Sequence, residues 1–199
     1  NYPELYFLNY VLFHRTNDEE IKPCRTYFWK KIKDKVQGKA MVEAALEINH
    51  WCAGEVMYQG TDMRTGSALE IYRSGVGRCG EEAVFVVNVM RSAGIPARPV
   101  YVPRWSHCDD NHAWVEVWCD GDWHYLGACE PEAVLDKGWF TNAASRAMMI
   151  GSRWYDRAMP DEKVIGKDGM NRIINLLGKY AKTRWITITV EDLDGTPAA

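Results

Sequence analysis

Residues 75–92, GVGRCGEEAVFVVNVMRS, join a glycine-rich approach to Cys79 with an apolar run long enough for a buried helix. Gly94 and Pro96 follow the run, as is usual where a helix ends. A helix that starts beside Cys79 directs its free N–H groups and its positive dipole end at the thiol, which favours the thiolate. The same N–H groups can bind the oxyanion formed when a thiolate attacks a carbonyl. The stretch therefore predicts a cysteine nucleophile at the start of a helix, with a small buried cysteine as the alternative.

Two carboxylates complicate this interpretation. Glu81 and Glu82 directly follow the nucleophile and its glycine, and a nearby negative charge raises the pKa of a thiol. Acidic residues are also typical of the first turn of a helix. We therefore expect Glu81 and Glu82 to point away from Cys79.

His112 opens the second informative stretch. It follows a polar run, SHCDDN at residues 106–111, and residues 112–119 alternate between two faces as a half-buried strand does. A histidine at the mouth of a strand can offer one ring nitrogen to a thiolate while an acceptor orients the other nitrogen. We expect Cys79 and His112 to form a catalytic pair, with a surface histidine in a loop as the alternative.

The polar run also offers a metal site as an alternative. His107, Cys108, Asp109, Asp110 and His112 are all metal-binding residue types, but their spacing matches no tetrahedral zinc pattern. The six cysteines include no C-x-x-C pair, which argues against a zinc ribbon and against a thioredoxin-type site. We therefore expect neither a metal nor a cofactor.

The remaining patterns predict an α+β fold with an antiparallel sheet. Apolar residues recur at helical spacing in residues 21–36 and 41–51. The expected strands are residues 98–103, 112–119 and 123–127, the last two joined at an Asp120-Gly121 hairpin turn, followed by a helix at 139–146 and strands at 147–150 and 185–190. Because residues 185–190 alternate without a return strand, we expect one domain at 1–182 and the start of a truncated following β domain at 183–199.

The composition excludes several classes of protein. The 199 residues are 47% hydrophobic and 26% charged with a net charge of −3, which is typical of a globular protein and leaves no overall basic surface for nucleic acid. The sequence contains no apolar run near the ~18 residues that a membrane span needs. Nine tryptophans indicate aromatic clefts or an aromatic core. The first residue is Asn1 and no signal peptide is visible, so localisation stays unknown, with export to the periplasm or the exterior as one hypothesis.

The motifs together resemble the core of the transglutaminase-like superfamily, which shares the papain-like fold. The matching motifs, in order, are GVGRC ending at Cys79, GIPAR at residues 94–98, NHAWVE at 111–116 and GDW at 121–123, within residues 51–132. Residues 1–50 are similar to the helical lead-in of bacterial members. The resemblance implies N-terminal helices, a nucleophile helix packed on an antiparallel sheet, and a Cys79–His112 pair.

The third catalytic position departs from the family pattern. The family places an aspartate at the end of the strand after the tryptophan, whereas this sequence has Gly127 and Ala128 there. Glu130, followed by Pro131, is the nearest substitute, with Asn111 or a backbone carbonyl as the runner-up for orienting His112.

Three further residues are candidates for the oxyanion hole or the substrate groove. The resemblance implies that Trp51 donates its indole N–H to an oxyanion, with a core tryptophan as the alternative. Arg104 and Trp105 precede His112 and are candidates for the substrate groove, with ordinary loop residues as the alternative.

The expected function is thiol-dependent hydrolysis or acyl transfer at peptide or side-chain amides, without a cofactor. The sequence leaves open a deglycosylating amidase of the peptide:N-glycanase type, although the paired C-x-x-C motifs of the eukaryotic glycanases are absent. A non-catalytic carbohydrate- or peptide-binding module with a degenerate triad is the third hypothesis. The expected partners are peptide, protein or glycopeptide substrates and further domains of the parent protein, but not nucleic acid.

Overall fold

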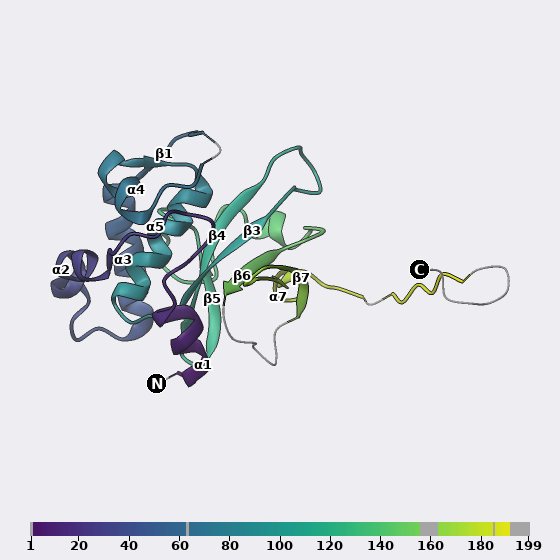
Figure 1. Ribbon diagram of the computed structural model, residues 1–199, viewed down its shortest axis with the longest axis horizontal. Helices are drawn as coiled ribbons and strands as arrows, with labels where there is room; N and C mark the ends of the chain where they lie inside the picture. Colours follow the sequence, from purple (N-terminus) through teal and green to yellow (C-terminus); the bar gives the residue numbers. More distant parts are fainter. Residues whose placement is uncertain (1, 63, 156–162, 185, 192–199) are drawn as a thin grey trace.

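An antiparallel, strongly twisted sheet with helices packed on it forms the centre of the computed structural model, which describes residues 2–62, 64–155, 163–184 and 186–191 (Figure 1). The helices are α1 (Glu4–Phe7), η1 (Leu8–Leu12, a π-helical turn), α2 (Arg25–Val36), α3 (Met41–Glu55), α4 (Ala68–Ser74), α5 (Cys79–Ser92), α6 (Thr141–Ala144) and α7 (Leu177–Tyr180). The strands are β1 (Met57–Tyr58), β2 (Val76–Gly77), β3 (Ala97–Val102), β4 (His112–Cys119), β5 (Asp122–Leu126), β6 (Gly151–Tyr155), β7 (Val164–Asp168) and β8 (Asn171–Asn175).

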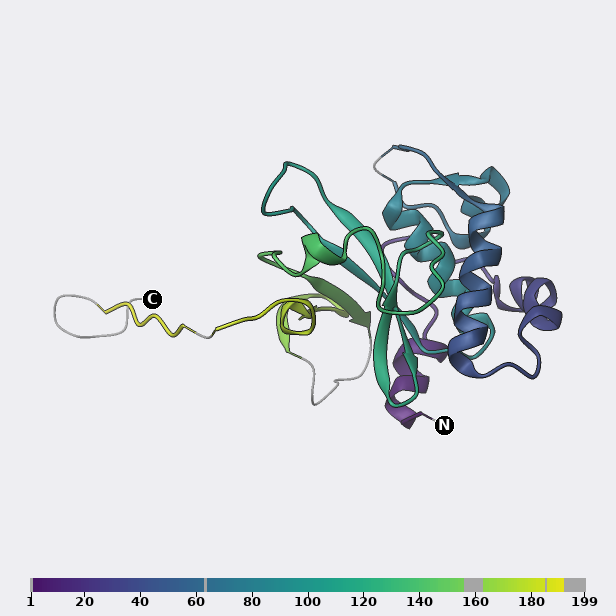
Figure 2. The same cartoon turned by 180° about the vertical axis from the view of Figure 1, so that it is seen from behind.

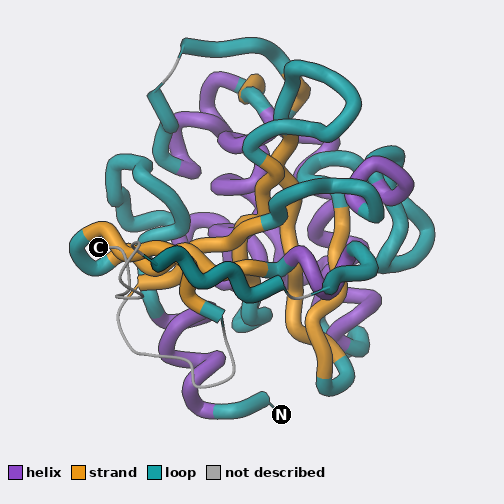
Figure 3. Tube along the Cα trace, turned by 90° about the vertical axis from the view of Figure 1, so that its right-hand side faces the viewer, coloured by secondary structure: helices purple, strands orange, loops and turns teal. Residues whose placement is uncertain are grey.

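The large sheet has six strands in the order β5-β4-β3-β6-β8-β7, and each neighbouring pair is antiparallel. Strands β4 and β5 run upright in Figure 3, whereas other strands of the sheet lie nearly across them, so the sheet twists strongly. The short strands β1 and β2 pair separately in parallel. This arrangement confirms the predicted α+β class with an antiparallel sheet.

Helix α5 is the central helix of the helical layer. It packs against β3 and β4 on one side and against α2, α3 and α4 on the others, so nearly all of its side chains are buried. Figure 2 shows this helical layer on one side of the molecule and the strands β6 to β8 on the other. Within the described residues, none of the helices combines the length and apolarity that crossing a membrane requires.

Strand β4 separates two apolar cores. Val115 and Val117 contribute to the core shared with the helices, whereas Trp114 points into a second core on the opposite face with Phe140 and Trp154. This is the alternation predicted from sequence. The β4–β5 hairpin turns at Asp120 and Gly121, whose φ angles of 52° and 96° are both positive, as a type I′ turn requires.

A buried polar network links helix α7 to the sheet. Arg98 of β3 and Glu116 of β4 form an ion pair at 2.7 Å, with their side chains 0% and 3% exposed. The Tyr180 hydroxyl donates to Glu116 at 2.7 Å, and the Trp114 indole donates to Tyr180 at 3.0 Å. The Arg98 guanidinium also lies 4.1 Å from the centroid of the Trp123 ring. The hydrogen bond from Tyr180 to Glu116 therefore joins helix α7 to the sheet. It also offsets part of the cost of burying the Arg98–Glu116 ion pair.

The last third of the chain differs from the sequence prediction. The helix expected at residues 139–146 is the short α6, and the strand expected at 147–150 begins later, as β6. Residues 186–190 form no strand although they alternate, and Ile186, Ile188 and Val190 are 80%, 81% and 64% exposed. Alternation stabilises a strand only where a neighbour covers its apolar face. The domain boundary near Thr183 stays a prediction.

Candidate active site

Cys79 is the first residue of α5 and lies in a cleft between the helical layer and the sheet. The glycine-rich approach ends in the N-cap residue Arg78, whose extended backbone turns the chain into the helix. The cleft has a volume of about 570 Å³, and its lining includes Cys79, Gly80, His112, Glu130 and Trp139. The N–H groups of Cys79 and Gly80 belong to the first helical turn and have no intrahelical acceptor, because the residues four positions earlier are outside the helix. Both groups are therefore available to an oxyanion.

His112 begins β4 and is only 7% exposed. Rings surround its imidazole: the centroids of Trp139 and Phe140 lie 4.7 and 5.0 Å away, and Trp114 lies 5.9 Å away. These contacts hold the plane of the imidazole through packing. Strand β4 lies beside α5, which is why the start of the strand comes close to the start of the helix.

The structure brings Cys79, His112 and Glu130 together. His112 Nε2 lies 3.7 Å from Glu130 Oε2, so Nδ1 is the ring nitrogen left for the thiol of Cys79. Burial disfavours the charged imidazole, but the hydrogen bond to Cys79 and the negative charge of Glu130 outweigh burial and raise the pKa of His112 to about 9. The imidazole therefore carries a proton at neutral pH. This is the protonation state needed for an ion pair with a cysteine thiolate.

A tight turn after β5 carries Glu130 back to the position of the missing aspartate. The Glu130 N–H donates to the Gly127 carbonyl at 3.2 Å, and Cys129 within the turn has a positive φ of 56°. A Cβ atom on Gly127 would lie 2.7 Å from the Cβ of Glu130 and closer still to its Oε2. Glu130 thus occupies the space that a side chain at position 127 would need, and a glycine at 127 leaves this space open.

Trp139 is a site residue that the sequence interpretation missed. Its indole Nε1 donates to Glu130 Oε1 at 2.9 Å, while its ring packs against His112. Each carboxylate oxygen of Glu130 thus faces one member of the site, since Oε2 faces His112. Trp139 lies in a turn just before α6, although the sequence prediction began a helix at this residue.

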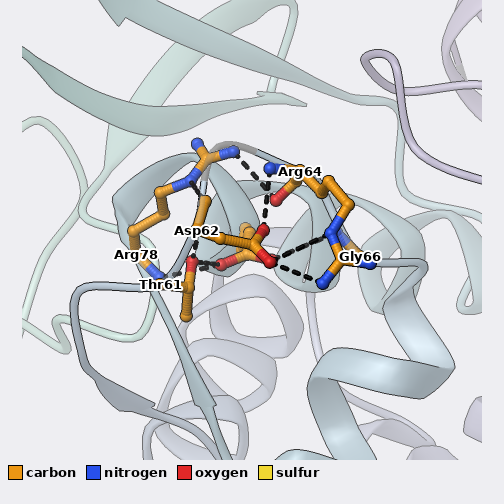
Figure 4. A network of polar contacts seen from close by, with 6 residues as sticks. Thr61, Asp62, Arg64, Gly66 and Arg78 are labelled. Carbon is orange, nitrogen blue, oxygen red and sulfur yellow. Dashed lines mark hydrogen bonds and ion pairs between the residues drawn. The ribbon is translucent and has the colours of Figure 1, made fainter.

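The carboxylate of Glu81 binds the loop that precedes α4. This carboxylate accepts hydrogen bonds from the Thr61 hydroxyl, from the Gly66 N–H at 3.1 Å and from the Arg78 N–H at 3.2 Å. The Arg78 side chain donates to the Asp62 carbonyl at 3.3 Å, so both residues fasten the loop to the start of α5 (Figure 4). Glu81 therefore does point into the loop, as expected for a carboxylate that does not oppose the thiolate.

Glu82 is buried beneath the site, 4% exposed. Burial, followed by the charge of Glu130, raises its pKa to about 8, although His112 acts in the opposite direction. Glu82 is consequently neutral for the most part at pH 7. It adds little negative charge beside Cys79, although it lies close to the site.

Within the described residues, the three candidates for the oxyanion hole and groove do not line the cleft, although the ring of Trp105 stacks near His112 at a centroid distance of 6.4 Å. Trp51 stacks on Tyr72 at 6.0 Å within the helical core, so the structure favours the alternative of a core tryptophan. Trp105 is 4% exposed and stacks on Trp114 at 6.5 Å. The exposed Arg104 pairs with Asp109 at 3.3 Å. Loop packing, which periodicity does not specify, decided the positions of Arg104 and Trp105, whereas Trp51 is held within helix α3. Asn111, the runner-up for orienting His112, does line the cleft.

The residues considered as metal ligands do not gather. Across the described part of the chain, no three His, Cys, Asp or Glu side chains are grouped so that they would hold a metal ion. All six cysteines are free thiols; Cys79 is half-buried and Cys108 is exposed.

The chain matches the model of a known protein family. The family model of the transglutaminase-like superfamily matches residues 30–128, a segment that contains both Cys79 and His112. No curated protein sequence matches the chain. The helices packed on an antiparallel sheet agree with the fold that the resemblance to this superfamily implies.

Solved structures that resemble the chain are longer than the segment they share with it. A proposed cysteine protease from Cytophaga hutchinsonii is 18% identical, with a TM-score of 0.44, over 76% of this chain and 57% of that one. LapG from Legionella pneumophila is 17% identical, with a TM-score of 0.45, over 56% and 66% of the two chains. A proposed protease from Parabacteroides distasonis is 17% identical, with a TM-score of 0.48, over 64% and 25%.

Proposed function

Because residues 30–128 place the chain in the transglutaminase-like superfamily, we propose that it is a cysteine-dependent amidase that hydrolyses peptide or side-chain amides. Cys79 is the nucleophile, His112 the general acid and base, and Glu130 the residue that orients His112. The observation that carries the proposal is the convergence of these three side chains in one cleft, with Glu130 in the place of the family's aspartate.

The first half of the reaction forms a thioester. The Cys79 thiolate attacks the amide carbon, and the carbonyl oxygen becomes an oxyanion that the N–H groups of Cys79 and Gly80 can stabilise. When the tetrahedral intermediate collapses, the C–N bond breaks and the protonated His112 gives its proton to the leaving amine. The raised pKa of His112 favours this protonated starting state.

The second half releases the acyl group. Neutral His112 takes a proton from water, the resulting hydroxide attacks the thioester, and the Cys79 thiolate leaves as His112 keeps the proton. The product is a carboxylic acid, and the site returns to its starting state. An amine in place of water would give acyl transfer. Because we identify no selective binding site for an amine among the described residues that line the cleft, hydrolysis is the reaction we propose.

The position of Glu130 favours a catalytic role of the site over a role in binding alone. Without an acceptor, the imidazole samples both tautomers and loses its alignment, and loss of the orienting residue of such a triad can cost ~10⁴ in kcat. Glu130 at 3.7 Å from Nε2 supplies this acceptor from a neighbouring sequence position. The distance is longer than a hydrogen bond, as is common in sites without substrate.

The test is the pH dependence of iodoacetamide alkylation, read by peptide mapping for each cysteine. Cys79 should react well below the free-thiol pKa of ~8.5, whereas the exposed Cys108 of the same chain serves as an ordinary thiol for comparison. Peptides, glycopeptides and cell-wall peptides are then offered to wild type and to Cys79→Ala. Cleavage of glycopeptides alone would indicate a deglycosylating amidase. Inert Cys79 with no cleavage of any amide would indicate a binding module.

A further inference from the structure

Asn49 of α3 contacts the turn that carries Glu130 from both ends of its side-chain amide. Its Nδ2 donates to the Gly127 carbonyl at 2.9 Å, and its Oδ1 accepts from the Cys129 N–H at 3.1 Å. Asn49 is 1% exposed, so both contacts are shielded from water. These bonds join residues that are 78 and 80 positions apart in the sequence.

The turn needs such support because of its backbone. Cys129 has a φ of 56°, in the left-handed region that a residue with a side chain rarely adopts. Residues in this region keep the conformation only where the surroundings impose it. The two bonds from Asn49 fall on Gly127 and Cys129, on either side of the turn, and Glu130 is the next residue.

We propose that Asn49 is a positioning residue for catalysis, which fixes the Gly127–Glu130 turn so that the Glu130 carboxylate stays against His112. The inference rests on the proposed function of the site. Among the described residues, the hydrogen bonds of the Asn49 side chain go to Gly127 and Cys129 and not to Cys79 or His112, so Asn49 acts through the backbone of the turn. A side chain that can only accept or only donate would hold one side of the turn and release the other.

The experiment compares Asn49→Ala with Asn88→Ala. Asn88 is a matched control, because it is also a buried asparagine whose amide donates two bonds, to the Thr16 hydroxyl at 3.2 Å and to the Val84 carbonyl at 2.9 Å, away from the turn. The readout is the NMR titration of the His112 ring, assigned by its loss in His112→Gln, together with the alkylation rate of Cys79 at pH 7.

The expected result is specific to Asn49. Its alanine variant should lower the pKa of His112 by one unit or more, because Glu130 drifts away, and should slow alkylation of Cys79 several-fold. Asn88→Ala should lose thermal stability with both readouts unchanged. If Asn49→Ala does not fold, Asn49→Leu keeps nearly the size of the side chain without adding a charge, removes both bonds to the turn, and should shift the pKa of His112 in the same direction.

Two failures can be told apart. An unchanged His112 titration in a folded Asn49 variant, beside a reactive wild-type Cys79, would overturn the positioning role and leave the proposed function standing. An unreactive Cys79 in wild type would instead overturn the proposed function. A His112 pKa that falls equally in Asn49→Ala and Asn88→Ala would mean that Asn49 supports general stability alone.

Discussion

Substitution of Gly127 by alanine should disable the site although it adds a single methyl group away from the nucleophile. The new Cβ would lie 2.7 Å from the Glu130 Cβ, whereas carbon atoms without a bond settle at about 3.5–4.0 Å. The Glu130 Cβ cannot rotate away as a side-chain end can, so the backbone of the turn must shift by roughly 1 Å. A displacement of that size in a catalytic group can cost ~10²-fold in rate. Complete loss of the orienting carboxylate sets the upper limit at ~10⁴.

We therefore expect kcat/KM of Gly127→Ala to fall by about 10²- to 10⁴-fold, or about 2.7–5.4 kcal/mol of transition-state stabilisation at about 1.36 kcal/mol for each factor of ten. The assay is cleavage of any amide that wild type hydrolyses, with thermal unfolding measured beside it. Gly54→Ala is the matched control, because a Cβ at Gly54 of α3 meets no atom within 4 Å and its rate should stay at the wild-type value.

A double variant tests the spatial argument directly. Gly127→Asp with Glu130→Ala moves the carboxylate to the family's usual position and empties the space that Glu130 fills. This variant should recover part of the rate that Glu130→Ala alone loses. The reasoning would be refuted if Gly127→Ala kept the wild-type rate, since the turn would then tolerate a side chain at 127 without moving the acceptor.

Three further predictions concern His112, Trp139 and the buried ion pair. The pKa of His112 is raised from 6.5 to about 9, so the stability that protonated His112 contributes is complete below pH 6.5 and is lost as pH rises through 9. Activity should fall on the alkaline side near pH 9. In a pH–rate profile, Glu130→Gln should move that fall to lower pH. Trp139→Phe keeps a ring against His112 but removes the donor to Glu130. Because this bond is exposed to solvent, which weakens it, kcat should drop only several-fold. An unchanged kcat would show that the indole N–H is dispensable. Glu116→Gln leaves Arg98 buried without its charge partner and should lower the free energy of unfolding by about 3–5 kcal/mol, as measured by urea denaturation. Cys79 should stay reactive in the folded variant. A loss below 1 kcal/mol would contradict the burial of the pair.

Local patterns in the sequence predicted the elements that carry the proposed catalytic pair. The apolar run after Cys79 became α5, the alternation after His112 became β4, and Asp120-Gly121 became the hairpin turn. Each of these features follows from the period of a helix, the period of a strand or the φ angles of a turn, and residues close together in the sequence determine all three. The order of the motifs then indicated the family, and the family model confirmed it.

The alternation of residues 186–190 shows the limit of such patterns. The period of a strand was present, but in the described residues no neighbouring strand covers it, and the apolar side chains are exposed. Trp51 shows the same limit for a single residue, because its sequence position fitted an oxyanion donor while packing against Tyr72 placed it in the helical core.

Tertiary structure decided the position of the proposed acceptor, Glu130. The sequence could nominate Glu130 as the nearest carboxylate, but the reason that it reaches His112 is the turn that folds it over Gly127. Trp139 contacts the Glu130 carboxylate from the turn before α6. Asn49 contacts the turn from helix α3, whose apolar spacing predicts the helix but not this contact. Contacts between residues 78 and 80 positions apart depend on how the layers pack, and no local period encodes them.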